Sequence, residues 1–155
     1  MSLKPLVLIV IGSKSDTEIM KECLALLEEF GIGYKLEISS AHRNPEKTAK
    51  LAREAKNKGY QAIIAAAGMA AALPGVIASH TSLPVIGVPM PGSNLNGIDA
   101  LLSMVQMPAG IPVGVVAIGK PGAKNAAILA AQILGLNNNH IADKLEKYRR
   151  TLKQG

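Results

Sequence analysis

The stretch Leu6–Ile11, LVLIVI, is a run of consecutive aliphatic residues that is followed at once by GSKSD at 12–16. A short continuous apolar run that ends in a glycine turn is typical of a strand buried on both faces of a sheet. Residues 17–30 then place apolar side chains at helical spacing, and Gly31 and Gly33 are expected to end that helix. This order of strand, polar turn and helix predicts the first unit of a parallel α/β sheet.

The alternation of strand and helix continues along the chain. Further strands are expected at residues 34–38, 62–66, 84–88 and 113–118, and further helices at 45–58, 97–106, 123–134 and 138–154, with a small-residue loop at 67–75 that enters another helix. The pattern predicts a single α/β domain over residues 1–155, with a parallel sheet of about five strands covered by helices on both faces. Ligands of such folds bind outside the carboxyl ends of the strands. The polar and glycine-rich loops all follow strands, so the chemistry is expected at that edge.

The composition favours this fold class. Hydrophobic residues make up 48% of the 155 residues but aromatic residues only 3%, so the core must consist of small and aliphatic side chains, which suit helices packed on a sheet. Cys23 is the single cysteine and is expected in the core, which excludes an intrachain disulfide and favours the cytoplasm. No apolar run reaches the roughly 18 residues of a membrane span, so neither a membrane span nor a signal peptide is expected.

The formal net charge is +6, and the basic residues are concentrated in the segment 47–58 and in the C-terminal helix. Acidic residues interleave with the basic ones in that helix, which is typical of a solvated helix face. There is no basic–aromatic interleaving and no nucleic-acid module, so nucleic acid is not the expected partner. A basic surface also suits a protein whose substrates are phosphate monoesters.

The first loop with candidate site residues is GSKSD. Ser13, Ser15 and Asp16 lie between a strand and a helix, where backbone N–H groups and the helix dipole favour an anion. Asp16 is also expected to be the N-cap of that helix. The alternative is a structural role alone, in which these side chains satisfy only amides of the turn and the helix.

The second loop, SAHRNP at residues 40–45, contains Ser40, His42 and Arg43. It places a proton carrier next to a side chain that binds anions through two hydrogen bonds. The alternative is a surface loop with two solvated side chains. His80 and His140 are expected to be ordinary helix residues, and the spacing of the histidines predicts no metal site.

The third loop, AAAGMAAALPG at residues 65–75, has almost no functional side chains. Small residues let backbone amides approach a ligand closely. The candidate binding residues of this loop are therefore Gly68, Met69, Ala70, Ala71, Ala72 and Leu73. Tight packing of a helix against the sheet is the competing explanation.

Taken together, these motifs resemble the N5-carboxyaminoimidazole ribonucleotide mutase family of purine biosynthesis. The hallmarks of that family are similar to GSxSD, SAHRTP, GAGGAAHLPG, LPVIGVP, SIVQMPxGIPV and GAKNAA. This chain has, in the same order, GSKSD at 12–16, SAHRNP at 40–45, AAGMAAALPG at 66–75, LPVIGVP at 83–89, SMVQMPAGIPV at 103–113 and GAKNAA at 122–127. The resemblance therefore extends over nearly the whole chain.

The resemblance implies a three-layer αβα, flavodoxin-like fold, a homo-octamer and an enzyme that needs no metal, ATP or biotin. The implied reaction moves a carboxylate from the exocyclic nitrogen to C4 of an aminoimidazole ribonucleotide, a small-molecule ribonucleotide monophosphate. Ser13, Asp16 and Arg43 match substrate-binding positions, and Arg43 with the serine loop suits the ribose phosphate. His42 matches the catalytic histidine, which would donate a proton as CO₂ leaves and then accept the C4 proton. The backbone of residues 68–71 would hold the CO₂ in a confined pocket.

Three positions depart from the family pattern: Asn44 replaces Thr, Met69 replaces Gly and Ala72 replaces His. Met69 is expected to line or narrow the pocket for CO₂. Ala72 removes a histidine that could orient substrate or relay a proton, and losing a general acid/base typically costs about 10²–10⁴-fold in rate. Because His42 is retained, we expect an active enzyme with an altered rate or pH profile. His80 lies roughly 12 Å beyond position 72, too far to replace that histidine.

Several alternatives stay open at this point. A direct aminoimidazole ribonucleotide carboxylase would use CO₂ itself, but members of that branch usually have Lys after the histidine and lack the LPG ending that this chain has at 73–75. A catalytically impaired nucleotide-binding homologue would follow from Ala72, but such a protein has no need of His42. The basic tail leaves a role in nucleic-acid binding as a further possibility. The alanine-rich stretch 123–134 fits burial against its own sheet and a subunit interface equally well.

Overall fold

The computed structural model describes residues 3–154, and at its centre lies a parallel sheet of five strands in the order β2-β1-β3-β4-β5. The strands are β1 (Pro5–Ile11), β2 (Gly33–Ile38), β3 (Ala62–Ala67), β4 (Val85–Pro89) and β5 (Gly114–Val115). The strand order reverses direction between β1 and β3. In open α/β sheets of this order, the crevice beside the carboxyl ends of these two strands is the usual ligand site.

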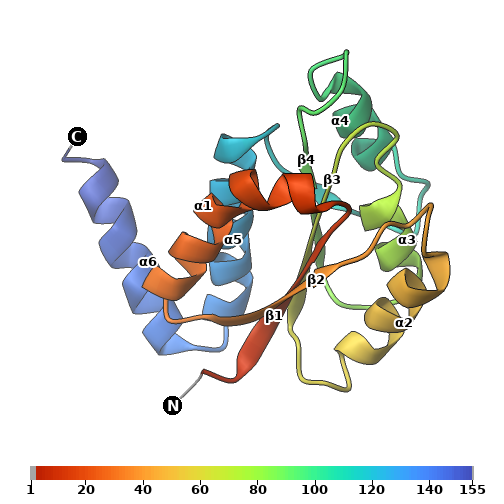
Figure 1. Ribbon diagram of the computed structural model, residues 1–155. Helices are drawn as coiled ribbons and strands as arrows, with labels where there is room; N and C mark the ends of the chain where they lie inside the picture. Colours follow the sequence, from red (N-terminus) through yellow and green to blue (C-terminus); the bar gives the residue numbers. More distant parts are fainter. Residues whose placement is uncertain (1–2, 155) are drawn as a thin grey trace.

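Helices cover both faces of the sheet (Figure 1). One layer contains α1 (Thr17–Glu29), α5 (Lys120–Gly135) and α6 (Asn139–Leu152), and the other contains α2 (Pro45–Ala55), α3 (Leu73–Ser79) and α4 (Ile98–Val105). A short 3₁₀ helix, η1 (Lys14–Asp16), precedes α1. The predicted three-layer, flavodoxin-like fold is confirmed.

The central strand β1 explains why its sequence is apolar without interruption. Val7, Ile9 and Ile11 pack with the layer of α1, α5 and α6, whereas Leu8 and Val10 pack with the opposite layer. These five side chains are at most 2% exposed. Since both faces of the strand are covered, every position has to be apolar.

The alanine-rich helix α5 has a face that is buried within this chain. Ala123, Ala127 and Ala131 have no exposed surface, and α5 contacts α1, α6 and the sheet. Burial against the chain's own sheet, one of the two possibilities that the sequence left open, is therefore observed. At the start of this helix, a Cβ on Gly122 would overlap the carbonyl oxygen of Ala117, so the close approach requires glycine.

The largest difference from the sequence prediction is the fifth strand. Only Gly114–Val115 are strand residues paired with β4, whereas 113–118 are predicted. The N–H of Val116 still donates to the Gly87 carbonyl oxygen at 3.1 Å. Beyond it, the chain at Ala117 lies directly against Gly122. Because β5 is an edge strand with one neighbour, packing against the start of α5 takes the chain out of the sheet.

Other boundaries shift by a few residues. Helix α2 ends at Ala55 instead of 58, and α5 begins at Lys120 instead of 123, because Pro121 fits the first turn of a helix. Gly33 is the first residue of β2 and does not end α1. Gly31, with a φ of 70°, follows α1 in the left-handed conformation that is common at helix ends.

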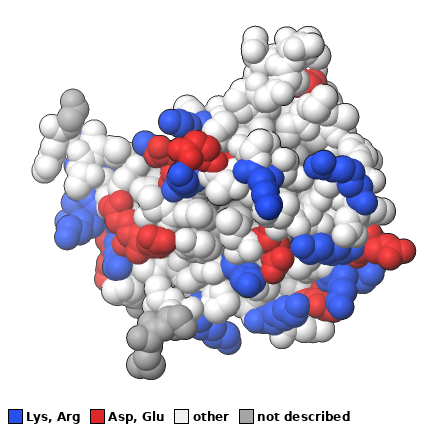
Figure 2. Space-filling model, in the orientation of Figure 1, with Lys and Arg blue, Asp and Glu red and all other residues white. Residues whose placement is uncertain are grey.

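On the face shown in Figure 2, the charges are of both signs and are not gathered in one patch of a single sign. Figure 2 shows Lys and Arg interleaved with Asp and Glu over the visible face, while the lobe that contains α4 in Figure 1 is nearly uncharged. In the sequence, Asp99 is the only Asp, Glu, Lys or Arg between Lys58 and Lys120. None of the helices within residues 3–154 is long and apolar enough to cross a membrane.

Candidate active site

An open cavity of about 610 Å³ lies at the carboxyl ends of the strands, where the loops after β1, β2, β3 and β4 meet. Its volume is within the roughly 300–1,000 Å³ that is usual for small-molecule sites. The cavity is lined by Gly12, Ser13, Ser15, Asp16, Ser40, Ala41, His42, Arg43, the continuous segment 67–73, Met90 and Gly92. It therefore occupies the switch point between β1 and β3 that the topology favours.

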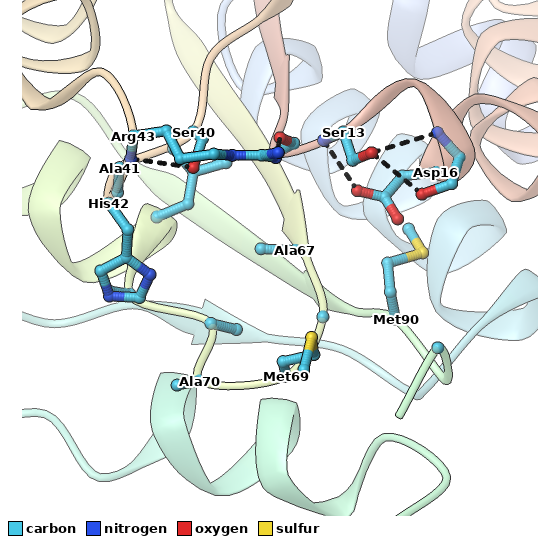
Figure 3. A pocket seen from close by; sticks show the side chains of 17 residues that line it. Ser13, Asp16, Ser40, Ala41, His42, Arg43, Ala67, Met69, Ala70 and Met90 are labelled. Carbon is cyan, nitrogen blue, oxygen red and sulfur yellow. Dashed lines mark hydrogen bonds between the residues drawn. The ribbon is translucent and has the colours of Figure 1, made fainter. Parts of the chain in front are cut away.

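The serine loop after β1 is held by hydrogen bonds among its own residues (Figure 3). The N–H of Ser13 donates to Asp16 Oδ2 at 3.1 Å, and Ser13 Oγ accepts from the N–H and the hydroxyl of Ser15 at 3.4 and 3.0 Å. Asp16 occupies the N-cap position of α1 as predicted, but its side chain makes no cap hydrogen bond to that helix. It turns back to Ser13 and completes a capping box around η1.

The Asp16 carboxyl is the group in this loop with a shifted pKa. Partial burial raises the pKa of Asp16, and the hydrogen bond from the Ser13 N–H lowers it by a smaller amount. The net direction is upward, because removing a carboxylate from water disfavours its charged form. The cavity wall thus holds a carboxylate that gains from any further hydrogen-bond donor brought by a ligand.

The second loop is anchored by buried hydroxyl groups. Ser39 Oγ and Thr48 Oγ1 lie 2.8 Å apart, and Thr48 Oγ1 donates to the carbonyl oxygen of Asn44 at 3.1 Å. The Asn44 side chain accepts from the N–H of Lys47 as the N-cap of α2, and Pro45 occupies the first turn as predicted. The segment between β2 and α2 is therefore fixed at both ends.

This loop presents His42 and Arg43 to the cavity. An Arg43 guanidinium N–H donates to the Gly12 carbonyl oxygen at 3.3 Å, and the Arg43 backbone N–H donates to Ser40 Oγ at 3.2 Å. Arg43 thereby joins the loops after β1 and β2. Figure 3 shows the Arg43 side chain extending toward the serine loop, whereas the His42 imidazole lies nearer to Ala70.

The wall between β3 and α3 offers backbone groups in place of functional side chains. The N–H of Ala71 donates to the Met69 carbonyl oxygen at 2.9 Å, and that of Ala72 donates to the Ala70 carbonyl oxygen at 2.7 Å. These bonds fold the segment into tight turns. Ala71 and Leu73 are buried, whereas Met69 and Ala70 are exposed to the cavity.

A model of the family described as AIR carboxylase matches residues 6–155. The chain belongs to the AIR carboxylase family. It is 54% identical over 149 residues to an N5-carboxyaminoimidazole ribonucleotide mutase of Saccharolobus solfataricus, covering 96% of this chain and 93% of that protein. It is 49% identical over 152 residues to the Bacillus subtilis protein of the same name, covering 98% and 94%. The crystal structure of Treponema denticola PurE is similar with a TM-score of 0.87 and 33% identity, over 97% of this chain and 92% of that one. The resemblance found in the sequence is confirmed.

For this member of the AIR carboxylase family, the structure gathers every predicted site residue, from Ser13 to Leu73, around one cavity. Met90 and Gly92 also line it and were not predicted. They follow β4, and the rule that loops after parallel strands meet at one edge indicates the loop but not these two residues.

The remaining histidines and the cysteine lie away from this cavity. His80 is the C-cap of α3 and lines a separate groove between α2 and α3, and His140 lies in the first turn of α6 as predicted. Cys23 is buried in the core, where desolvation raises the pKa of its thiol to about 12. Among the described residues, no group of three or more His, Cys, Asp or Glu could hold a metal ion.

Proposed function

We propose that this protein is an N5-carboxyaminoimidazole ribonucleotide mutase of purine biosynthesis, an isomerase that forms 4-carboxy-5-aminoimidazole ribonucleotide. One observation carries the proposal: His42 shares a cavity with an anion-binding wall and with a loop that has almost no functional side chains. Relatives at 49–54% identity over nearly the whole chain bear this name, which supports the same reaction here.

The ribose phosphate binds to the wall formed by the first two loops. Arg43 uses part of its guanidinium on the Gly12 carbonyl oxygen, which orients the side chain and leaves its other N–H groups for phosphate oxygens. The hydroxyls of Ser13, Ser15 and Ser40 line the same wall and supply further donors. Asp16 suits ribose hydroxyl groups, because a carboxylate accepts hydrogen bonds from them and repels a phosphate.

His42 carries the proton in both steps of the reaction. In the first step the C–N bond of the carbamate breaks, its electron pair stays on nitrogen, and His42 donates a proton to that nitrogen. In the second step C4 bonds to CO₂ with its own electron pair, and the C4 proton passes to His42. His42 ends in its starting state, so the atoms and electrons balance without metal, ATP or biotin.

The loop of Gly68, Met69, Ala70, Ala71, Ala72 and Leu73 holds the base and the CO₂ between these steps. Small side chains let its backbone approach the ligand closely. A confined, side-chain-poor wall also offers no nucleophile that would capture the CO₂. Ala72 supplies no proton carrier, so the proton transfers rest on His42.

We expect residues 1–155 to form one mutase domain that assembles as a homo-octamer in the cytoplasm. The support for assembly is an apolar stripe on and before α4, where Leu95, Ile98, Leu102 and Val105 are 49–61% exposed. An exposed apolar stripe on a nearly uncharged lobe is typical of a surface that another copy covers. Sedimentation of the wild type should give the octamer, and Leu102→Asp should give smaller species.

The deciding experiment is an assay free of metal and ATP with the purified protein. N5-carboxyaminoimidazole ribonucleotide should be converted to the C4-carboxylated product, and His42→Asn should slow the conversion by about 10²–10⁴-fold. A parallel assay supplies aminoimidazole ribonucleotide and modest bicarbonate. Product from the second assay alone would identify a direct carboxylase. No product from either, with nucleotide binding intact, would identify a binding protein that is not an enzyme.

A further inference from the structure

Met69 has a backbone conformation that the proposed function does not explain. Its φ is 55°, in the left-handed region that L residues with long side chains rarely adopt. Among residues 3–154, the other non-glycine residue with positive φ is Asn96, at 52°. Asparagine tolerates this region because its short amide can form local hydrogen bonds, but methionine has no such group. The fold therefore keeps a strained backbone conformation at Met69, where glycine would be free of strain.

The Met69 side chain is also exposed, although it is long and apolar. It is 65% exposed, and it is the one long side chain in a stretch, 67–72, that otherwise consists of alanine and glycine. Figure 3 shows Met69 on the side of the cavity opposite Arg43. Met90, which also lines the cavity, is 2% exposed and is fixed by its packing. Met69 is thus a flexible apolar side chain that borders the site and that packing within the chain leaves largely uncovered.

We propose that Met69 is a covering residue, which packs on the heterocycle of the bound ribonucleotide and shields the reacting carbon and the CO₂ from water. The inference rests on the proposed mutase function. Arg43 and the serine loop take the phosphate at one side of the cavity, which leaves the base for the side that carries Met69. Strain and apolar exposure are both unfavourable in the free protein, and contact between a thioether and an aromatic ring offsets them on binding.

Met69 changes no bond in the reaction. After the C–N bond breaks, CO₂ either bonds to C4 or escapes, and escape leaves the decarboxylated amine. A side chain over the base lowers the escape rate without taking part in either proton transfer. Met69 therefore changes the fraction of CO₂ that bonds to C4 relative to the fraction that escapes.

The first test follows the carboxyl carbon. Substrate labelled with carbon-13 in the carboxylate is converted in unlabelled bicarbonate, and loss in the absence of enzyme is subtracted. The wild type is expected to retain the label in its product, and Met69→Gly should release label about two- to tenfold more, the range of one thioether–aromatic contact. Met69→Leu, which keeps an apolar side chain of similar size, should restore retention.

The matched control is Asn96→Gly. It replaces the second non-glycine residue with positive φ, at a position that does not line the cavity. Asn96→Gly should retain label as the wild type does. Equal retention in Met69→Gly and the wild type would overturn the proposal, and so would equal release by Met69→Gly and Asn96→Gly.

A binding measurement tests the same contact without turnover. By calorimetry, Met69→Gly should raise the Kd for aminoimidazole ribonucleotide about two- to tenfold and leave that for ribose 5-phosphate unchanged, because only the first ligand has a base. Absence of turnover in the wild type would defeat the proposed function, whereas this comparison would still decide the role of Met69. An equal change in Kd for both ligands, or no change for either, would overturn the proposal for Met69.

Discussion

The two walls of the cavity are built on opposite principles. The wall formed after β1 and β2 consists of polar side chains, and hydrogen bonds such as those from Ser13 N–H to Asp16 and from Arg43 to Gly12 hold them in place. The wall formed after β3 consists almost entirely of alanine and glycine, and its shape comes from backbone turns. The first wall can bind charge and move protons, whereas the second can only fit closely around a ligand.

The contrast suits a cavity in which one wall binds the phosphate and the other excludes water. Polar groups for a phosphate need fixed directions, which buried partners such as the Ser39–Thr48 pair provide. A reacting CO₂ has no charge to bind, and it needs exclusion of water more than it needs donors. Substitutions in the first wall should therefore change rate and affinity strongly, and substitutions in the second wall should act more weakly, through partition and pH dependence.

The largest effect is expected from His42→Asn. Removing the proton carrier should lower kcat by about 10²–10⁴-fold while the Kd for the nucleotide changes little. His80→Asn is the matched control and should leave kcat unchanged, because His80 lies in the separate groove between α2 and α3. Steady-state kinetics and calorimetry measure the two quantities. Equal kcat values for His42→Asn and the wild type would show that another group moves the proton.

Arg43→Leu should act on binding. Losing charge-assisted hydrogen bonds to a phosphate should raise the Kd for the ribonucleotide about 10–100-fold. The Kd of Arg43→Lys should lie between those of the wild type and Arg43→Leu, because lysine keeps the charge but not the two parallel donors. The corresponding nucleoside, which has no phosphate, should bind all three proteins alike, and a parallel loss for the nucleoside would contradict this assignment.

Ala72→His tests whether the second wall works without a proton carrier. Both the wild type and the variant should turn over, and the variant should show an additional ionisation in its pH–rate profile. Its kcat should differ from that of the wild type by less than about 10²-fold, since the proposed mechanism assigns both proton transfers to His42. If neither protein shows turnover at any pH, the view that Ala72 is tolerated fails.

The smallest effect concerns Asp16 and stability. Burial raises the pKa of Asp16 in the folded protein above its ordinary 3.8, so the folded state binds this proton more tightly than the unfolded state. The resulting loss of folding stability is absent below pH 3.8 and is fully present once the pH exceeds the raised pKa. Asp16→Asn removes the ionisation, so its stability relative to the wild type should be higher at neutral than at acidic pH. Urea midpoints at both pH values measure this, and solvent around the half-buried carboxyl keeps the difference small.

The sequence predicts the fold well because the decisive patterns are local. The run LVLIVI at 6–11 indicates a strand with both faces covered, and glycines and prolines mark where elements end. The loops that line the cavity are found by a rule of topology, since loops after parallel strands lie at one edge of the sheet. Met90 and Gly92 were missed because no polar motif marks them, and their role in the wall follows only from the neighbour relation between β3 and β4.

The sequence by itself determined the class of fold, the positions of the loops and the chemical groups available in them. The tertiary structure decided which apolar helix is inside, with α5 buried and the stripe of α4 exposed, although both are apolar in sequence. It also decided that Asp16 turns back to Ser13, that β5 is short, and that Met69 has a positive φ. These features depend on contacts between residues distant in the chain or on competition between nearby partners. Periodicity and propensity describe one segment at a time, so they set the elements but not the choice among such contacts.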